Sequence, residues 1–295
     1  MKLEQLNTFV CVARLGSFTL AAEQLNTTQS TVSMRIVELE KSLDARLFGR
    51  STRGVTITTK GRELLAYAES IGRLVDEARA VVGDPAHLSG RIRIGVAELI
   101  ALTCLPEVMA AFQTIYPNVQ VDLEIGLTGT VMNRLNATNL QLGVVGMEPP
   151  ADPGLVTVPV GSMEFAFLAS PDLPIAEGQF SPDILQEYAV LNLGAGSYVA
   201  EAQAAWFRAN NVRPSRQSSC NSMLISARLA RSGFGVAFLP VGYFKEELES
   251  GALRRLDIQP SPPPIDFYAV HRAEDESPPI SSLIASIRAQ WPSTP

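Results

Sequence analysis

A run of short polar side chains, followed by a cluster of arginines, is the segment best suited to chemical recognition. Residues 28–35 carry Gln, Ser, Thr and Arg without a carboxylate, and such side chains match the donors and acceptors on base edges in the major groove. Five positive charges with no acid among them follow within the 17 residues 46–62, as expected where phosphates dock. A solvated basic loop is the alternative interpretation of the charges. The candidate DNA contacts are Thr28, Gln29, Ser30, Thr31, Ser33, Met34, Arg35, Arg50 and Arg53.

The charge of the chain is unevenly distributed. The 295 residues carry a net charge of −6, which taken alone argues against a nucleic-acid partner. Residues 1–90 hold 11 Lys and Arg against 10 Asp and Glu, whereas the remainder holds 13 against 20. The first ninety residues are therefore the part suited to contact DNA.

The elements that position the polar run are predicted by apolar spacing. Helices are expected near residues 3–13 and 19–25, and a turn at 26–28 leads into a third helix with its apolar face on Val32, Ile36 and Leu39. A short helix, a turn and a helix with a polar leading turn form a helix-turn-helix layout. An ordinary three-helix bundle would explain the apolar spacing but not the polar leading turn. Val55 and Ile57 alternate with threonines after Gly54 and predict a small β-wing.

A long helix is expected from Gly61 to about Val82. Its apolar residues follow a heptad spacing, which favours homodimerisation, although the helix could instead lie on its own domain. A two-fold dimer would present two recognition helices about one DNA turn apart, roughly 34 Å. The predicted seam is Leu64, Ala68, Ile71, Val75, Ala78 and Val82.

The N-terminal pattern strongly resembles the signature of LysR-type transcriptional regulators. The resemblance spans about sixty residues and rests on Leu3-x-x-Leu6-x-x-Phe9, Gly16-Ser17-Phe18, Ala21-Ala22-x-x-Leu25, Thr28-Gln29-Ser30-x-Val32-Ser33, Ile36-x-x-Leu39-Glu40, Leu47-Phe48-x-Arg50 and Thr58-x-x-Gly61. It implies a winged helix-turn-helix domain at 1–60, a dimerising linker helix at 61–87 and an effector-binding domain at 88–295. It also implies a dimer of dimers, whereas the sequence itself supports only the dimer seam.

The remaining two hundred residues alternate between strand and helix, and the expected helices include Ala101–Tyr116, Tyr198–Ala209 and Met223–Arg231. This alternation predicts a mainly parallel α/β sheet covered on both faces, so the chain as a whole is α/β behind an all-α winged N-terminal region. Leu105-Pro106, Tyr116-Pro117 and Ser232-Gly233-x-Gly235-Val236-x-x-Leu239-Pro240 resemble the effector-binding region of the same family. That resemblance implies the two-lobed fold of type 2 periplasmic binding proteins. Lobe one would comprise about 91–162 and 266–295, and lobe two about 163–265.

A candidate effector pocket lies where the predicted strands end, because ligands of open α/β sheets bind beyond the carboxyl ends of strands. Hydroxyls at three expected helix starts could converge on an anion, although each could be an ordinary N-cap. Glu98 opposes a simple anion site, and no Lys or Arg lies on these strand exits. A hydrogen-bonded amine and a weak acid held by neutral donors both stay open. The candidate residues are Ala97, Glu98, Leu99, Thr128, Gly146, Ser197, Asn221 and Ser222.

Other chemistry finds little support in the sequence. The two histidines lie 184 positions apart, which disfavours a metal site or a Ser-His-Asp triad. Val199 interrupts a dinucleotide-binding pattern after Gly194-x-Gly196. The sequence also contains no phosphate-binding P-loop. We expect Cys104 and Cys220 to be buried structural thiols. No metal and no cofactor are predicted. The absence of a signal sequence and of a long apolar segment predicts a cytoplasmic protein that does not contact a membrane.

The sequence thus predicts a DNA-binding transcriptional regulator controlled by a small molecule bound between two lobes, and not an enzyme. A regulator that responds to no effector is one alternative. A small-molecule enzyme on the same two-lobed scaffold is the other, and it lacks a readable set of catalytic residues.

Overall fold

The computed structural model describes residues 1–51, 54–82, 85–137, 139–147 and 152–292. The chain divides into two compact units, Met1–Leu88 and Ser89–Pro295. No helix in the described ranges is long and apolar enough to cross a lipid bilayer.

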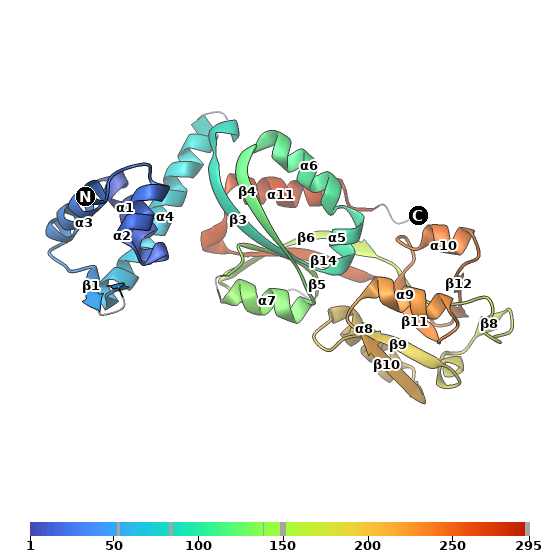
Figure 1. Cartoon of the computed structure of the whole chain (residues 1–295). Coiled ribbons are helices and arrows are strands. Elements are labelled where there is room, and N and C mark those ends of the chain that lie inside the picture. Colours follow the sequence, from blue (N-terminus) through green and yellow to red (C-terminus); the bar gives the residue numbers. More distant parts are fainter. Residues whose placement is uncertain (52–53, 83–84, 138, 148–151, 293–295) are drawn as a thin grey trace. The chain divides into compact units, whose positions relative to one another are not determined.

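The first unit is a helical bundle with a two-stranded wing and a long fourth helix (Figure 1). Ser17 caps the second helix and Thr28 caps the third, each hydroxyl accepting a hydrogen bond from a backbone N–H three residues later. Phe9 stacks near Phe48 in the core, with ring centroids 5.4 Å apart. The elements are α1 (Leu3–Leu15), α2 (Phe18–Gln24), α3 (Gln29–Leu43), β1 (Phe48–Ser51), β2 (Gly54–Ile57) and α4 (Thr59–Val82).

Side chains of the family signature hold the turn from α3 into the wing. The Glu40 carboxylate accepts a hydrogen bond from the Leu47 backbone N–H at 2.6 Å. The Thr58 hydroxyl accepts one from the Gly61 backbone N–H at 3.0 Å. A Cβ at Gly61 would lie 2.4 Å from the Leu47 carbonyl oxygen, so only glycine fits there. These three signature residues therefore shape the domain and need not contact a ligand.

The apolar face of α4 corrects part of the predicted dimer seam. Ala68 is buried in the core of the first unit, and Leu64 and Ile71 pack against that core. A heptad pattern identifies an apolar face but not the surface that covers it, so these three positions are occupied within the protomer. Tyr67 and Leu74 lie one heptad apart and are 70% and 62% exposed. The apolar stripe left open on α4 therefore includes this pair.

The second unit begins with lobe one, a five-stranded sheet in the order β4-β3-β5-β14-β6. Helices α6 and α11 cover one face of this sheet and α7 covers the other (Figure 1). The short helix η1 (Pro85–His87) ends the first unit. The elements of lobe one are β3 (Ser89–Val96), α5 (Glu98–Thr103), α6 (Leu105–Ile115), β4 (Asn118–Ile125), α7 (Thr128–Asn136), β5 (Leu142–Gly146), β6 (Leu155–Met163), β14 (Ile265–Arg272), η3 (Ala273–Asp275) and α11 (Pro278–Ala289).

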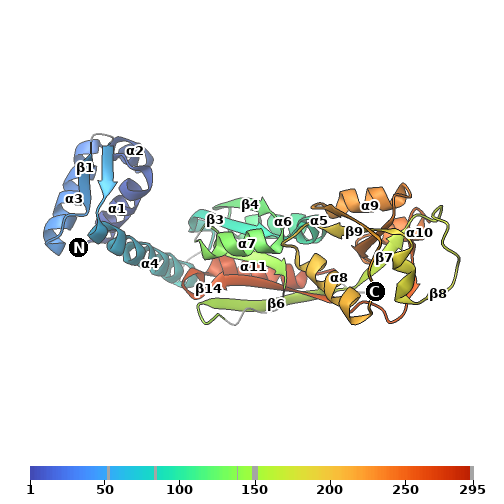
Figure 2. The same ribbon diagram turned by 90° about the horizontal axis from the view of Figure 1, so that it is seen from below.

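Lobe two is a second five-stranded sheet, in the order β10-β9-β11-β7-β12. Helices α9 and α8 pack on opposite faces of it (Figure 2). The two lobes are joined where β6 runs into β7 and where the chain returns into β14. The elements of lobe two are β7 (Phe165–Ala169), β8 (Gln179–Phe180), η2 (Pro182–Gln186), β9 (Ala189–Leu193), α8 (Tyr198–Ala209), β10 (Arg216–Cys220), α9 (Met223–Arg231), β11 (Val236–Pro240), α10 (Lys245–Glu249), β12 (Arg254–Arg255) and β13 (Asp257–Ile258).

Three expectations about the second unit were wrong in detail. The sheets are mixed and not mainly parallel, because the returning strand β14 pairs antiparallel with both β5 and β6, and β7 pairs antiparallel with β11 and β12. The helix expected at 101–116 is split at Cys104, since Pro106 in the first turn of α6 disfavours a helix that continues through it. Cys104 is buried as expected, but Cys220 is only half-buried.

Candidate functional site

The outward face of α3 carries polar and apolar side chains that are not packed into the core. Val32, Ile36 and Leu39 are buried, so the opposite face of the helix points to solvent. Ser30 is exposed there, and Gln29, the first residue of α3, is exposed at the leading end of the helix. Met34 is 56% exposed and Val37 is 61% exposed. The sequence prediction missed Val37, although its position one heptad after Ser30 and outside the buried set was a usable signal.

Four of the predicted DNA contacts, Thr28, Ser30, Thr31 and Arg35, have partners within the domain. The Thr28 hydroxyl caps α3 and lies 2.8 Å from the Ser30 hydroxyl and 2.9 Å from the Thr31 hydroxyl. The Arg35 guanidinium turns back onto α1, where it lies 3.4 Å from a Glu4 carboxylate oxygen. Its side chain is only 28% exposed. Ser33 is half-buried on the other flank of α3 from Arg35.

The wing supplies the other predicted DNA contacts. Arg50 lies in β1 opposite Val55 of β2, and Arg53 lies outside the described residues. Arg46, Lys60 and Arg62 flank the wing and are exposed. Positive side chains thus remain at the surface on both sides of the wing.

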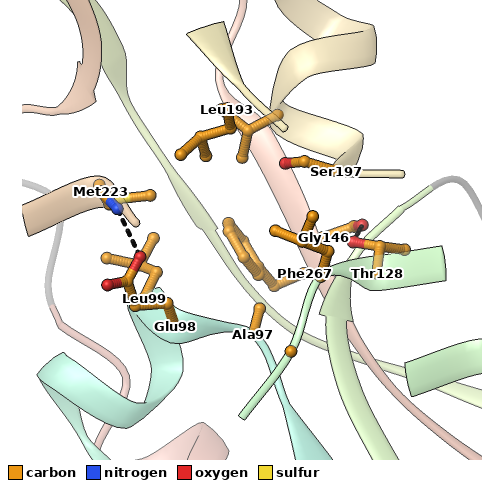
Figure 3. A pocket seen from close by; sticks show the side chains of 12 residues that line it. Ala97, Glu98, Leu99, Thr128, Gly146, Leu193, Ser197, Met223 and Phe267 are labelled. Atoms are coloured by element: carbon orange, nitrogen blue, oxygen red, sulfur yellow. Dashed lines mark hydrogen bonds between the residues drawn. The ribbon is translucent and has the colours of Figure 1, made fainter. Parts of the chain in front are cut away.

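A cavity lies between the lobes of the second unit, at the edge where the strands end (Figure 3). Its free space of about 390 Å³ includes the part open to solvent, and the volume inside it that admits a water-sized molecule is about 30 Å³. The structure brings six of the eight predicted effector residues to its wall. Those six are Ala97, Glu98, Leu99, Thr128, Gly146 and Ser197, and the other lining residues are Gly126, Leu127, Leu193, Val199, Met223 and Phe267.

Glu98 crosses the cavity and binds the start of a helix on the opposite lobe. Its Oε1 accepts a hydrogen bond from the Ser222 hydroxyl at 2.8 Å, and its Oε2 accepts one from the Met223 backbone N–H at 2.5 Å (Figure 3). Ser222 therefore does not line the cavity but holds Glu98 in place. Its hydroxyl also caps α9 by accepting from the Ile225 N–H at 3.4 Å. This carboxylate occupies a helix N-terminus, where an anion is favoured.

A second bridge joins the lobes on the other side of the cavity. The backbone N–H of Gly129, in the first turn of α7, donates to the Gly196 carbonyl at 2.9 Å. A Cβ at Gly129 would lie 3.4 Å from that carbonyl oxygen. The lobes are thus in contact on both sides of the cavity.

The hydroxyls of the cavity differ in their partners. Thr128 donates to the Gly146 carbonyl at 3.0 Å, so its oxygen remains an acceptor. Ser197 is 4% exposed and precedes α8 without capping it. Figure 3 shows its oxygen turned into the space above Phe267. Among the described residues, the Ser197 hydroxyl has no hydrogen-bond partner.

The electrostatics of the cavity are acidic. No Lys, Arg or His is among the described residues that line it. Burial, together with the carboxylates of Glu247 and Glu98, raises the pKa of the nearby Tyr243 phenol above its ordinary value, so this group stays protonated and neutral. The described residues hold no cluster of His, Cys, Asp and Glu that could bind a metal ion.

Phe267 and Met223 line the cavity and were missed by the sequence prediction for different reasons. Phe267 lies near the start of β14, and an antiparallel strand brings its beginning to the edge where its parallel neighbours end. Met223 is the first residue of α9, one position beyond the predicted Ser222. Asn221, which was predicted, is exposed and does not line the cavity.

Comparisons with known proteins agree on both units. The family model "LysR substrate binding domain" matches residues 85–292, and "Bacterial regulatory helix-turn-helix protein, lysR family" matches residues 3–62. The chain is 29% identical over 276 residues to the RuBisCO operon transcriptional regulator of Allochromatium vinosum, covering 92% of this chain and 90% of that one. It is 35% identical over 175 residues to the transcriptional regulator GltR of Bacillus subtilis, a match that spans 59% of each protein.

The fold agrees as well. The structure of a Corynebacterium glutamicum OxyR C206 mutant superposes with a TM-score of 0.69 at 22% identity, covering 98% of this chain and 93% of that one. The family models together span nearly the whole chain, and they carry the DNA-binding function of the first unit and the effector-binding function of the second. The chain belongs to the LysR family of DNA-binding transcriptional regulators.

Proposed function

We propose that the outward face of α3 reads base edges in the major groove, led by Gln29, Ser30 and Met34. The observation that carries this proposal is their exposure on a helix whose other face is buried. Gln pairs with adenine edges, and apolar side chains pack on the thymine methyl group. Val37 extends the same face, and its exposed methyl groups suit such a contact. Arg35, which is bound to Glu4, is the least suited of the predicted base contacts.

Selection of duplexes from a random library by the full chain tests this assignment. Gln29→Ala is expected to reduce the preference for the selected duplex over a scrambled one by about 1–3 kcal/mol, or roughly 5- to 150-fold. Glu23→Ala, on the exposed face of α2, is the control for a change outside α3. An equal loss on both duplexes for Gln29→Ala would contradict base recognition by this residue.

The arginines of the wing serve a different purpose in this proposal. Arg50 and Arg53 would contact phosphates, which position the domain but carry no sequence information. Arg53→Ala is therefore expected to weaken all duplexes alike and to reduce the salt-dependence slope by about one unit. An unchanged slope would show that Arg53 makes no phosphate contact.

The regulator acts as a dimer through α4, and two such dimers form the tetramer. The exposed pair Tyr67 and Leu74 supports the dimer contact, because apolar residues one heptad apart form the seam of paired helices. A two-fold dimer places two copies of α3 about 34 Å apart on one face of the duplex. The protein works in the cytoplasm, where its DNA lies.

The cavity between the lobes is the effector site, and a bound ligand changes the closure of the lobes and thereby the bend imposed on DNA. Ser197 supports this assignment, because its side chain is almost fully buried, does not cap α8 and turns its oxygen toward the cavity. A thermal-shift screen of metabolites against the full chain tests it, since a ligand that binds the folded state raises its stability. Turnover of a hit would favour the enzyme alternative, and the failure of a broad panel would favour a regulator without an effector.

A further inference from the structure

We propose that Glu98 is a tethered carboxylate that selects the ligand of the cavity. It fills the anion site at the start of α9, so the cavity takes a small apolar molecule that carries a hydrogen-bond donor, an amine or an amide, and not a carboxylate. This inference rests on the proposed function of the cavity as the effector site.

The contacts of Glu98 distinguish this role from ordinary helix chemistry. Glu98 is the first residue of α5, where an acidic side chain would stabilise its own helix. Its carboxylate instead accepts from the Ser222 hydroxyl and the Met223 N–H on the opposite lobe. The two hydrogen-bond donors at the start of α9 are thus occupied by the Glu98 carboxylate. A ligand carboxylate would have to displace Glu98 to reach them.

Displacement would leave two negative charges in a small space. The described residues that line the cavity include no Lys, Arg or His to offset them. Like charges repel strongly at short range where water is partly excluded. An anionic ligand is therefore opposed both by the occupied donors and by the charge of Glu98.

The other polar groups of the cavity favour a donor on the ligand. Thr128 uses its proton on the Gly146 carbonyl and offers only its oxygen as an acceptor. Ser197 is buried, faces the cavity and has no partner among the described residues. Glu98 and Thr128 thus provide acceptors for an N–H or ammonium donor, and the Ser197 hydroxyl can accept or donate. The rest of the wall is apolar, with the Phe267 ring as its floor (Figure 3).

Three probes of one shape and different charge test the proposal: benzoate, benzamide and benzylamine. Binding to the full chain is measured by calorimetry at constant ionic strength. We expect the wild-type chain to bind benzylamine or benzamide at least tenfold more tightly than benzoate. Glu98→Ala is expected to reverse this order, because it frees the start of α9 and removes the charge. Glu98→Gln keeps the side-chain length without the charge and is expected to lie between the two.

A matched control removes a carboxylate elsewhere in the same lobe. Glu107 is exposed in the first turn of α6 and does not line the cavity, so Glu107→Ala is expected to keep the wild-type order. A wild-type chain that binds benzoate as tightly as benzamide, or that binds none of the three probes, overturns the proposal. A Glu98→Ala chain that folds and fails to bind benzoate also overturns it. If Glu98→Ala does not fold, the wild-type order and Glu98→Gln decide.

Duplex binding in the same samples separates this inference from the proposed function. If the order of the probes reverses in Glu98→Ala but no probe changes the affinity for the selected duplex, the ligand class stands and the effector role of the cavity is wrong. If a probe changes duplex binding but the order is the same in both chains, the effector role stands and the role of Glu98 is wrong.

Discussion

The outward side of α3 and the cavity between the lobes differ in whether their side chains are already engaged within the protein. Met34 and Val37 project from one helix and are 56% and 61% exposed. Their side chains are therefore free to contact a partner molecule. In the cavity, Glu98 already binds Ser222, 124 positions away. The difference indicates that exposed residues of α3 can change with little effect on the fold, whereas a change of a buried residue in the cavity wall, such as Phe267, alters the packing of the effector domain.

Removing one apolar side chain from each region is the strongest test of this contrast. Phe267 is 1% exposed and packs near Trp291, with ring centroids 5.3 Å apart. Phe267→Ala is expected to lower the free energy of unfolding of the effector domain by about 3–5 kcal/mol, because it leaves a void in the core. Met34→Ala is expected to change stability by less than about 0.5 kcal/mol and to weaken duplex binding. Chemical denaturation of both variants measures the difference, and similar losses of stability would break the comparison.

The second test asks whether the DNA-binding unit has close packing of its own near the wing. Gly61→Ala would force a Cβ to within 2.4 Å of the Leu47 carbonyl, and overpacking of this kind costs about 1–3 kcal/mol. Gly72 lies in the same helix, and a Cβ there meets nothing within 4 Å. Gly72→Ala is therefore expected to stabilise the unit by about 0.5–1 kcal/mol. Thermal unfolding of the two variants should shift in opposite directions, and a shift in the same direction would rule out the steric account.

A third test concerns the exposed stripe of α4, which like α3 presents apolar side chains to solvent. Leu74→Glu would place a charge on the proposed dimer contact, and the dissociation constant of the dimer is expected to rise at least tenfold, or about 1.4 kcal/mol. Leu20 of α2 is 49% exposed and provides the control, since Leu20→Glu adds the same charge away from α4. Sedimentation equilibrium measures both constants. An equal effect of the two substitutions would place the dimer contact elsewhere.

The two regions also differ in how far the sequence predicts them. The α3 surface follows from local spacing, because Val32, Ile36 and Leu39 define the buried face and therefore the exposed one. In the second unit, α8 and α9 have the bounds that the sequence predicted, Tyr198–Ala209 and Met223–Arg231. Six of the eight predicted effector residues line the cavity, because strand ends are local features.

The pairings between distant segments could not be predicted in the same way. Nothing near Glu98 in the sequence specifies that its carboxylate reaches α9, since that contact depends on how two lobes close. Phe267 was missed because the direction of β14 depends on its pairing with β5. The seam of α4 was assigned to a partner for the same reason, as periodicity does not identify the surface that covers Ala68.

The smallest expected effect separates two serines that look alike in the sequence. Both Ser197 and Ser222 stand before a helix, but only Ser222 caps its helix and binds Glu98. Ser222→Ala is expected to cost about 1 kcal/mol of stability through the lost cap. Ser197→Ala removes a hydroxyl without a described partner and is expected to change stability by less than about 0.5 kcal/mol while weakening the binding of a ligand with an N–H donor. Thermal unfolding and calorimetry with benzamide measure the two effects, and a loss of stability in Ser197→Ala equal to that in Ser222→Ala would show that its hydroxyl serves the fold and not the ligand.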